Sequence, residues 1–358
     1  MTRHAPMARP ALRPLVRLFA LLAAAAFGVA PTLGAQAAPD RAAWEVPRTP
    51  AGHPDLQGNW TNATLTPFQR AEGRDRIFTW EEVREIEGVG EDGCPANPGT
   101  IACGRRAIPT RADGTTTNEA FLSGQEYNEF YWDRGSQVAI INGEPRASLL
   151  TRPSNGRRPP LTEAAQARLA ERREFRSQFE QYDHPELRPL AERCIVSFGM
   201  SAGPPMVPNS AYNNNYTIVQ TDDHILILAE MVHDVRIIRL GEGPPLPESI
   251  TPWFGDSWGH WEGDVLVVET TNLNPEHAFR GIRPTASTKV TERFSRIDAE
   301  TILYDFTIED PTTYTEAWGG EIPFKAQNQL LYEYACHEGN YSMEGVLKGA
   351  RYEERRGG

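Results

Sequence analysis

The sequence predicts a mainly β fold: an antiparallel up-and-down barrel or a strongly curled sheet, with one long accessory helix. The first indication is a run of short segments from Tyr216 onward that are rich in β-branched and aromatic residues. The second is the shortness of their connections, such as 221–223 and 298–300, which favours pairing of consecutive strands. Such a sheet is expected to close, because closure removes its edges. A propeller is the alternative, but no repeat of about 40 residues occurs.

The predicted antiparallel β domain covers residues 201–358. Its best-defined hairpin joins 258–261 to 265–270 through Glu262-Gly263-Asp264, where Gly263 has the freedom to take a positive φ. We expect strands at 216–220, 225–231, 235–240, 258–261, 265–270, 289–296, 301–308, 316–325 and 330–336.

The preceding region, residues 38–200, is expected to pack on this domain. Thr79 and Glu82 have the spacing of a capping box at the start of a short helix. Residues 161–182 are predicted to form the long helix, with Thr162 as its N-cap. We place the short helix at 79–87, a surface loop at 88–114, and short strands at 60–65, 130–132, 137–141 and 146–150.

Residues 1–37 have the pattern of a cleaved signal peptide. Four arginines are interspersed before an apolar run from Leu18 to about Ala30, and small residues lead to an expected cleavage after Ala37. A membrane anchor is the alternative, but the run is shorter than a bilayer-spanning helix. We therefore expect a periplasmic or secreted protein, with no membrane insertion after the signal is cleaved.

The chain is acidic, with a formal net charge of −12. Residues 1–37 hold four arginines and no acidic residue, so their loss changes the charge to −16. This charge disfavours nucleic acid and anionic membrane surfaces as partners. The sequence has no phosphate-binding loop or dinucleotide fingerprint, and Ser257 lies in GDSWG rather than in a nucleophile elbow. The expected partner is a small organic molecule.

The four cysteines of an exported protein are expected to form disulfides, because they meet an oxidising compartment. Cys94 and Cys103 flank a loop rich in Pro, Gly and Asn, which suits a local bridge. Cys194 and Cys336 would then join a helix end to the last predicted strand. Zinc binding is the alternative, but the spacings lack any C-x-x-C pair.

Several long motifs give the chain a family resemblance over residues 44–349. They are RC at 193–194, YNNNYTIVQT at 212–221, EMVHDVRII at 230–238, GDSWGHWEGDVLVVETTN at 255–272, ERF at 292–294, TIEDP at 307–311 and YEYACHEGNYSMEG at 332–345. Together they resemble a widespread family of exported, mostly uncharacterised bacterial proteins. The resemblance implies an exported β-rich protein that handles organic small molecules, and it supplies no catalytic residues. The chain departs from the pattern at Trp258 and His260. Separately, Gly58-Asn59-Trp60 resembles the first strand of lipocalin or calycin barrels.

His233 and Asp234 fall at the tip of an expected hairpin, with Glu230 and Arg236 within reach. A carboxylate beside an imidazole orients the ring and moves its pKa upward toward neutrality, which suits general acid–base catalysis. The alternative is a solvated turn. We predict that His233 and Asp234 are catalytic and that Glu230 and Arg236 bind substrate.

A second polar group, His337, Glu338 and Asn340, follows the last predicted strand. A disulfide at the adjacent Cys336 would fix the backbone and hold these side chains in place for a substrate. A cap for the following turn is the alternative. We predict that His337 and Glu338 are catalytic and that Asn340 binds substrate.

The ligand types of His233, Asp234, His337 and Glu338 also suit one divalent metal, although no H-x-H or H-E-x-x-H spacing is present. We predict no cofactor, and a single divalent metal at these four residues is the alternative.

The predicted hairpin supplies further polar and aromatic side chains. Asp256, Trp258 and His260 are predicted to bind substrate, with Arg280 of the following loop as a partner for an anionic group. Glu309-Asp310 is a paired-carboxylate candidate, although a charged pair before proline is more typical of a turn that ends a strand.

The sequence thus favours an exported small-molecule enzyme: a cofactor-independent lyase, isomerase or hydrolase that acts on an apolar or aromatic substrate by acid–base catalysis. A periplasmic binding protein of lipocalin type is the alternative, and a single-metal enzyme is the second. The ionisable residues favour an enzyme, because each buried charge costs several kcal/mol and a carrier of apolar ligands needs few. A pocket with His233 and His337 side by side would support catalysis, whereas an apolar cavity lacking both would support carriage.

Overall fold

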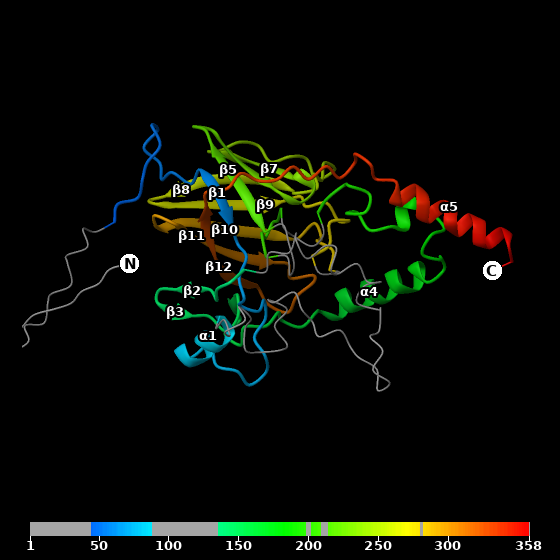
Figure 1. Cartoon of the computed structure of the whole chain (residues 1–358), viewed down its shortest axis with the longest axis horizontal. Coiled ribbons are helices and arrows are strands. Elements are labelled where there is room, and N and C mark those ends of the chain that lie inside the picture. The colour runs from blue at the N-terminus through cyan, green and yellow to red at the C-terminus, as the bar shows by residue number, and fades with distance from the viewer. Residues whose placement is uncertain (1–43, 88–134, 198–201, 209–213, 280–281, 358) are drawn as a thin grey trace, which may run out of the picture. The chain divides into compact units, whose positions relative to one another are not determined.

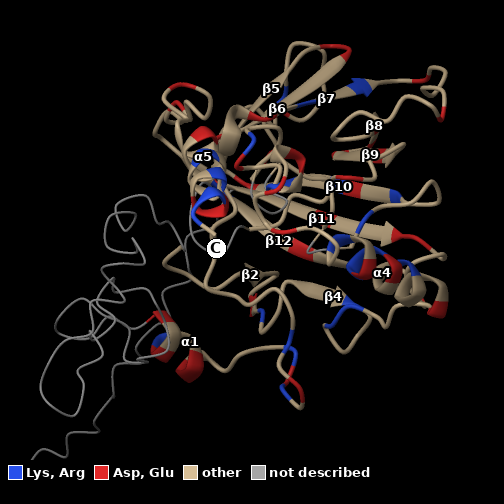
Figure 2. Cartoon of the chain, turned by 90° about the vertical axis from the view of Figure 1, so that its right-hand side faces the viewer, with Lys and Arg blue, Asp and Glu red and all other residues tan. Residues whose placement is uncertain are grey.

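The computed structural model describes residues 44–87, 135–197, 202–208, 214–279 and 282–357. Within them nine strands close into a barrel (Figure 1). In order around the barrel they are β1 (Gly58–Thr61), β5 (Asn215–Gln220), β6 (His224–Ala229), β7 (Val235–Leu240), β8 (Asp256–Glu262), β9 (Val265–Thr271), β10 (Lys289–Asp298), β11 (Thr301–Glu309) and β12 (Trp318–Gln327), which pairs again with β1. Figure 2 shows β8 to β12 in this order from top to bottom, below β5, β6 and β7. The prediction of a mainly β barrel is confirmed.

One neighbouring pair is parallel, where the sequence predicted consecutive antiparallel pairing. β7 and β8 run in the same direction, with Arg239 opposite Trp258 and Leu240 opposite Gly259. A closed ring with an odd number of strands needs at least one parallel pair, because strand direction must match after a full circuit. The connection 241–255, which is rich in Gly and Pro, therefore returns along the barrel before β8 begins.

The two ends of the barrel differ in the length of their connections. At one end, here called the turn end, three strand pairs are joined by residues 221–223, 263–264 and 299–300. At the other end, here called the loop end, strand pairs are joined by residues 230–234, 272–288 and 310–317. Binding and catalytic residues occur most often on loops held by a rigid scaffold. The loop end is therefore where a functional site is expected.

The barrel interior is filled by apolar side chains. The large aromatic residues that are at most 1% exposed are Trp60, Tyr216, Phe294, Tyr304, Phe306, Trp318 and Phe324. Burying each of them contributes roughly 1.5–3 kcal/mol to folding, so this cluster is a main source of stability. Because the interior is packed, a ligand site is expected at an end of the barrel.

Three α-helices lie among the described residues: α1 (Trp80–Glu87), α4 (Glu163–Arg176) and α5 (Ser342–Arg355). The predicted capping box of α1 is confirmed, since Thr79 N donates to Glu82 Oε2 at 2.8 Å and Glu82 N donates to Thr79 Oγ1 at 3.2 Å. The cap of α4 is also confirmed, because Ala165 N donates to Thr162 Oγ1 at 3.2 Å. This helix ends at Arg176 rather than at residue 182. Its one buried residue is Ala165, so packing does little to extend it.

The predicted strand at 330–336 is wrong, because this segment is irregular and leads to α5, which was not predicted. β12 pairs with β11 along one edge and with β1 and β4 along the other, so the described strands already cover both of its edges. The start of β12 also pairs with β4 (Leu150–Arg152), which covers only the end of the predicted strand 146–150. None of the described helices is long and apolar enough to cross a bilayer.

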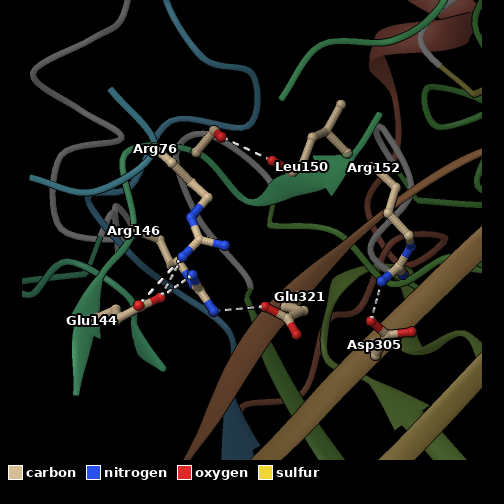
Figure 3. A network of polar contacts seen from close by, with 8 residues as sticks. Arg76, Glu144, Arg146, Leu150, Arg152, Asp305 and Glu321 are labelled. Atoms are coloured by element: carbon tan, nitrogen blue, oxygen red, sulfur yellow. Dashed lines mark hydrogen bonds and ion pairs between the residues drawn. The ribbon is translucent and has the colours of Figure 1, made fainter. Parts of the chain in front are cut away.

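Arginine ion pairs attach residues 140–152, which include β4, to the barrel (Figure 3). The buried Arg146 donates to Glu144 Oε2 at 2.6 Å and to Glu321 Oε2 of β12 at 3.1 Å. Arg152 donates to Asp305 Oδ2 of β11 at 2.8 Å. A buried guanidinium needs such counter-charges, because an unpaired buried charge is strongly destabilising. The segment contains a two-stranded hairpin, β2 (Ile140–Ile141) and β3 (Glu144–Pro145).

Candidate functional site at the loop end of the barrel

The β6–β7 turn at 230–234 carries predicted catalytic residues and contacts two distant segments. His233 Nδ1 lies 2.9 Å from the carbonyl oxygen of Tyr334, and the carbonyl can only accept, so Nδ1 carries the hydrogen. Asp234 Oδ2 accepts a hydrogen bond from Ser197 N at 2.8 Å. We call this set of contacts the clasp, because it holds the C-terminal segment and the segment around Ser197 on the barrel.

Glu230 also belongs to the clasp. It is 5% exposed, and it accepts hydrogen bonds from Asn215 Nδ2 at 2.6 Å and from Tyr332 N at 3.3 Å. The turn itself is strained, since Val232 and His233 have φ values of +61° and +47°. A β-branched residue in the left-handed region is unfavourable, so the surrounding contacts must hold it there.

The carboxyl group of Asp234 titrates near neutral pH. Burial raises its pKa to about 6, although hydrogen bonds from Ser197 and the charge of His233 oppose the rise. The turn therefore holds a carboxyl group whose pKa is raised by burial. Its Oδ2 accepts the hydrogen bond from the backbone N–H of Ser197.

His337 and Glu338 are exposed, and their side chains make no hydrogen bond or ion pair with any described residue. Tyr334 connects His233 to the segment that carries them, but no such contact joins His233 to His337. The catalytic role of His233, Asp234, His337 and Glu338 stays a prediction.

The predicted disulfide between Cys194 and Cys336 is confirmed, with the two Cα atoms 5.7 Å apart. Beside it, Asn340 Nδ2 lies 3.3 Å from the sulfur of Cys194, so this side chain, predicted to bind substrate, supports the bridge. The other predicted pair, Cys94 and Cys103, lies outside the described residues.

Arg236, predicted to bind substrate, lies inside the barrel and is 1% exposed. It alternates with exposed residues on β7, so it faces inward and forms a two-bonded ion pair with Glu292, with Nη1 2.8 Å from Oε1. It also donates to Thr270 Oγ1 at 2.9 Å. Burial lowers the pKa of Arg236, but the charge of Glu292, its hydrogen bond and the influence of Tyr304 together outweigh burial and raise the pKa above the ordinary value. Tyr304 O–H donates to Glu292 at 2.7 Å, which adds a further partner inside the barrel.

The hairpin residues predicted to bind substrate lie on one face of β8, and each has a partner within the protein. Asp256 pairs with Arg239 and accepts a hydrogen bond from Leu246 N at 2.6 Å, which fixes the connection between β7 and β8. The guanidinium of Arg239 lies 4.0 Å from the ring centroid of Trp258. His260 is exposed and lies 3.3 Å from Glu262. The fourth residue, Arg280, is outside the described residues.

A cavity of about 30 Å³ opens at the loop end, between the loops 272–288 and 310–317. It has room for about one or two water molecules or for one functional group of a ligand. Its lining is mainly apolar, with five polar members: His277, Arg283, Thr288, Asp310 and Tyr314. Val290 and Ile308 of the lining are opposite each other on β10 and β11, and Val290 is also opposite Thr270. Thr270 also accepts a hydrogen bond from Arg236, so it links the strand residues that line the cavity to the Arg236–Glu292 ion pair.

His277 is the residue of this lining with an unused hydrogen-bonding atom. Its ring is 4% exposed, and Nδ1 lies 2.9 Å from the carbonyl oxygen of Trp253, which fixes the hydrogen on Nδ1. Nε2 is buried and has no hydrogen-bond partner among the residues that the structure describes. Burial lowers the pKa of His277, and the hydrogen bond to Trp253 opposes this only in part. The ring is therefore neutral at pH 7, with a free lone pair on Nε2.

The other polar residues of the lining differ from His277. Asp310 accepts from the hydroxyl groups of Thr288 at 2.6 Å, Thr285 at 3.0 Å and Thr312 at 2.8 Å, so its oxygens are occupied. Burial would raise the pKa of Asp310, but these hydrogen bonds lower it, and the carboxylate stays ionised. Burial raises the pKa of Tyr314, which keeps its hydroxyl protonated. The cavity thus combines a neutral acceptor with a neutral donor.

His277 was not predicted as a site residue from the sequence. Asp310 was considered as a carboxylate candidate, but the histidine in Asn274-Pro275-Glu276-His277 was not singled out. The available signal was position, because this histidine lies in the longest loop between two consecutive antiparallel strands. Its burial and its unpaired nitrogen depend on Trp253, which is 24 residues away in the chain.

Among the described residues, no three His, Cys, Asp or Glu side chains are grouped so that they could hold a metal ion. Comparisons with models of protein families, with curated proteins and with solved structures gave no match. The fold and the cavity therefore define the chain as a closed, mixed β-barrel with a small, mainly apolar cavity among its long loops.

Proposed function

We propose that this protein is an exported enzyme that acts on a small apolar or aromatic molecule by general acid–base catalysis at the loop-end cavity. The observation that supports this most directly is a buried neutral imidazole, His277, in a mainly apolar cavity. Cavities with a few converging polar groups and perturbed pKa values are typical of active sites.

In this proposal His277 is the base and Tyr314 is the acid. The hydrogen bond from Nδ1 to Trp253 leaves Nε2 to take a proton from the substrate or from a water molecule. Tyr314, kept neutral by burial, donates a proton or a hydrogen bond to the oxygen or nitrogen on which charge develops. The reaction classes that need such a pair are lyases, isomerases and hydrolases, with no cofactor.

The test is turnover by the purified mature protein, screened against small apolar and aromatic compounds. Replacing His277 by Ala is expected to lower turnover roughly 10²–10⁴-fold, the usual contribution of a general base. The matched control is His224→Ala at the turn end, which should keep wild-type turnover. Near-ultraviolet circular dichroism of each variant checks that the fold is retained.

Two other results would assign the catalysis to different residues or to a metal ion. If His233→Ala and His337→Ala abolish turnover while His277→Ala does not, the catalytic residues are those of the clasp and its neighbours. If a chelator abolishes turnover of the wild type, the single-metal alternative is supported instead.

A periplasmic binding protein of lipocalin type is the second candidate. It is favoured by the lining of the cavity, which is mainly apolar and includes neither His233 nor His337. A compound that stabilises the protein against heat but is recovered unchanged after long incubation would support carriage rather than catalysis.

A further inference from the structure

The unpaired Nε2 of His277 restricts what a ligand must offer. Its hydrogen-bonding state is fixed by geometry: Nδ1 donates to Trp253, and a neutral imidazole then has only an acceptor at Nε2. Phe254 packs against the ring edge-on, at 5.5 Å between centroids, which helps to fix its orientation. These two contacts hold the ring in one orientation, in which Nε2 rather than Nδ1 is left without a partner.

The remaining charged groups of the described lining already have partners. Asp310 is surrounded by threonine hydroxyls, and Arg283 is ion-paired with Glu276. The nearby side chains of Val290 and Ile308 are apolar. A ligand group that enters the cavity thus meets a lining that contains one buried acceptor without a partner, His277 Nε2, and one protonated hydroxyl, that of Tyr314, among mainly apolar side chains.

A buried acceptor without a partner is unfavourable, and a ligand that donates a hydrogen bond removes this penalty. A ligand that offers only acceptors, such as an ether, can accept from the Tyr314 hydroxyl but leaves His277 Nε2 without a partner. We propose that the loop-end cavity recognises the hydroxyl or N–H group of an otherwise apolar ligand through His277 Nε2. This inference rests on the location proposed above for the functional site, but not on catalysis.

The size of the cavity narrows the ligand class further. About 30 Å³ accepts the donor group and the atoms next to it, while the rest of the ligand lies against the apolar lining or outside the cavity. Phenols, small alcohols and amides with a free N–H fit this description. Phenol, its methyl ether anisole and benzene are matched probes, because they share the ring and differ in the donor.

The experiment is nitrogen NMR of the histidine side chains in the mature, ¹⁵N-labelled full chain, titrated with each probe. The signals of His277 are assigned from their loss in His277→Leu. Phenol is expected to shift the Nε2 resonance of His277 and to bind roughly 5- to 150-fold more tightly than anisole, as one buried hydrogen bond implies. In His277→Leu the preference for phenol over anisole should vanish, and His224→Ala should keep it.

Equal binding of phenol and anisole by the wild type would overturn the inference, as would phenol binding that leaves Nε2 unshifted or no phenol binding at all. Turnover has a separate outcome. Recognition of phenol without turnover of any compound keeps the inference and rejects the proposed enzyme. Turnover of substrates that lack a donor group keeps the enzyme and rejects the inference.

Discussion

Two buried carboxyl groups at the loop end respond to their surroundings in opposite directions. Burial raises the pKa of Asp234 to about 6, because the opposing hydrogen bonds come from Ser197 alone. The pKa of Asp310 is lowered despite its burial, because hydrogen bonds from several threonines stabilise the ionised form. Hydrogen bonding to the charged form therefore decides which carboxyl group can exchange a proton near neutral pH.

The raised pKa of Asp234 predicts a pH-dependent change in stability. The native state binds more protons than the unfolded state between about pH 4 and pH 6, so Asp234 lowers the free energy of unfolding as pH rises through this window. Asp234→Asn keeps an oxygen for Ser197 but does not titrate. The difference in free energy of unfolding between Asp234→Asn and the wild type should therefore shift in favour of the variant from pH 4 to pH 7, by at most roughly 3 kcal/mol. Urea unfolding at both pH values measures this, with the exposed Asp222→Asn as control, and a constant difference would contradict it.

The ion pair inside the barrel predicts strong coupling between Arg236 and Glu292. Glu292→Gln leaves the guanidinium of Arg236 buried without a counter-charge, so it should lower the free energy of unfolding by about 3–5 kcal/mol. The double variant Arg236→Met, Glu292→Met removes both charges and should be more stable than Glu292→Gln. Urea unfolding of Arg236→Met, of Glu292→Met and of their double variant gives the coupling energy. Additive losses would show that the two residues act independently.

At the scale of the element, two positions require glycine for different physical reasons. Gly263 in the β8–β9 turn has a φ of +61°, and an added Cβ would meet no atom within 4 Å. Gly320 of β12 lies against β4, and its Cβ would fall 2.3 Å from the carbonyl oxygen of Leu149. Replacing Gly263 by Ala strains the backbone alone, whereas replacing Gly320 by Ala must push β4 and β12 apart.

We therefore predict that Gly263→Ala destabilises the protein by about 1–2 kcal/mol and that Gly320→Ala destabilises it more. Thermal unfolding compares the two variants directly. Equal changes in melting temperature would mean that β4 can move away from β12 without loss, which the close approach at Leu149 contradicts.

Elements with a local cause could be predicted from the sequence. The capping box at Thr79 and the cap at Thr162 depend on residues three positions apart, and both form as expected. The β8–β9 hairpin forms because Gly263 supplies the positive φ of a two-residue turn. The disulfide from Cys194 to Cys336 also formed as predicted, although it joins residues 142 positions apart.

Features that depend on closure of the barrel could not be predicted in the same way. The parallel pair β7–β8 follows from the odd number of strands, which no single segment encodes. The segment 330–336 has strand-like residues but meets no free edge. Likewise, Arg236 looks like a surface residue in the sequence, and its inward position becomes clear only when Glu292 is found opposite it.

At the scale of the molecule, the C-terminal segment is held to the barrel by the disulfide and by the clasp. Blue and red segments alternate along both α4 and α5, the helices that face the viewer in Figure 2. No residue of α5 is buried, so its own packing contributes little to this attachment. The disulfide closes a long loop, with a sequence separation of 142 residues.

Removal of this bridge should therefore release the C-terminal segment before the barrel unfolds. In the double variant Cys194→Ala, Cys336→Ala, we expect faster proteolysis near residues 330–341 and a loss of stability of up to about 5 kcal/mol. The β-sheet signal in circular dichroism should persist at 25 °C. Unchanged proteolysis would show that the contacts of His233 and Glu230 hold the segment by themselves.

The central claim is that the small-molecule site is the loop-end cavity. It is tested most directly by a thermal-stabilisation screen of the wild type and of Leu273→Trp, in which the larger side chain fills the cavity from its lining. The control is Val219→Trp, at an exposed position of β5. Compounds that raise the melting temperature of the wild type and of Val219→Trp are predicted to have no effect on Leu273→Trp. If they stabilise folded Leu273→Trp as strongly as the wild type, the ligand binds elsewhere on the molecule.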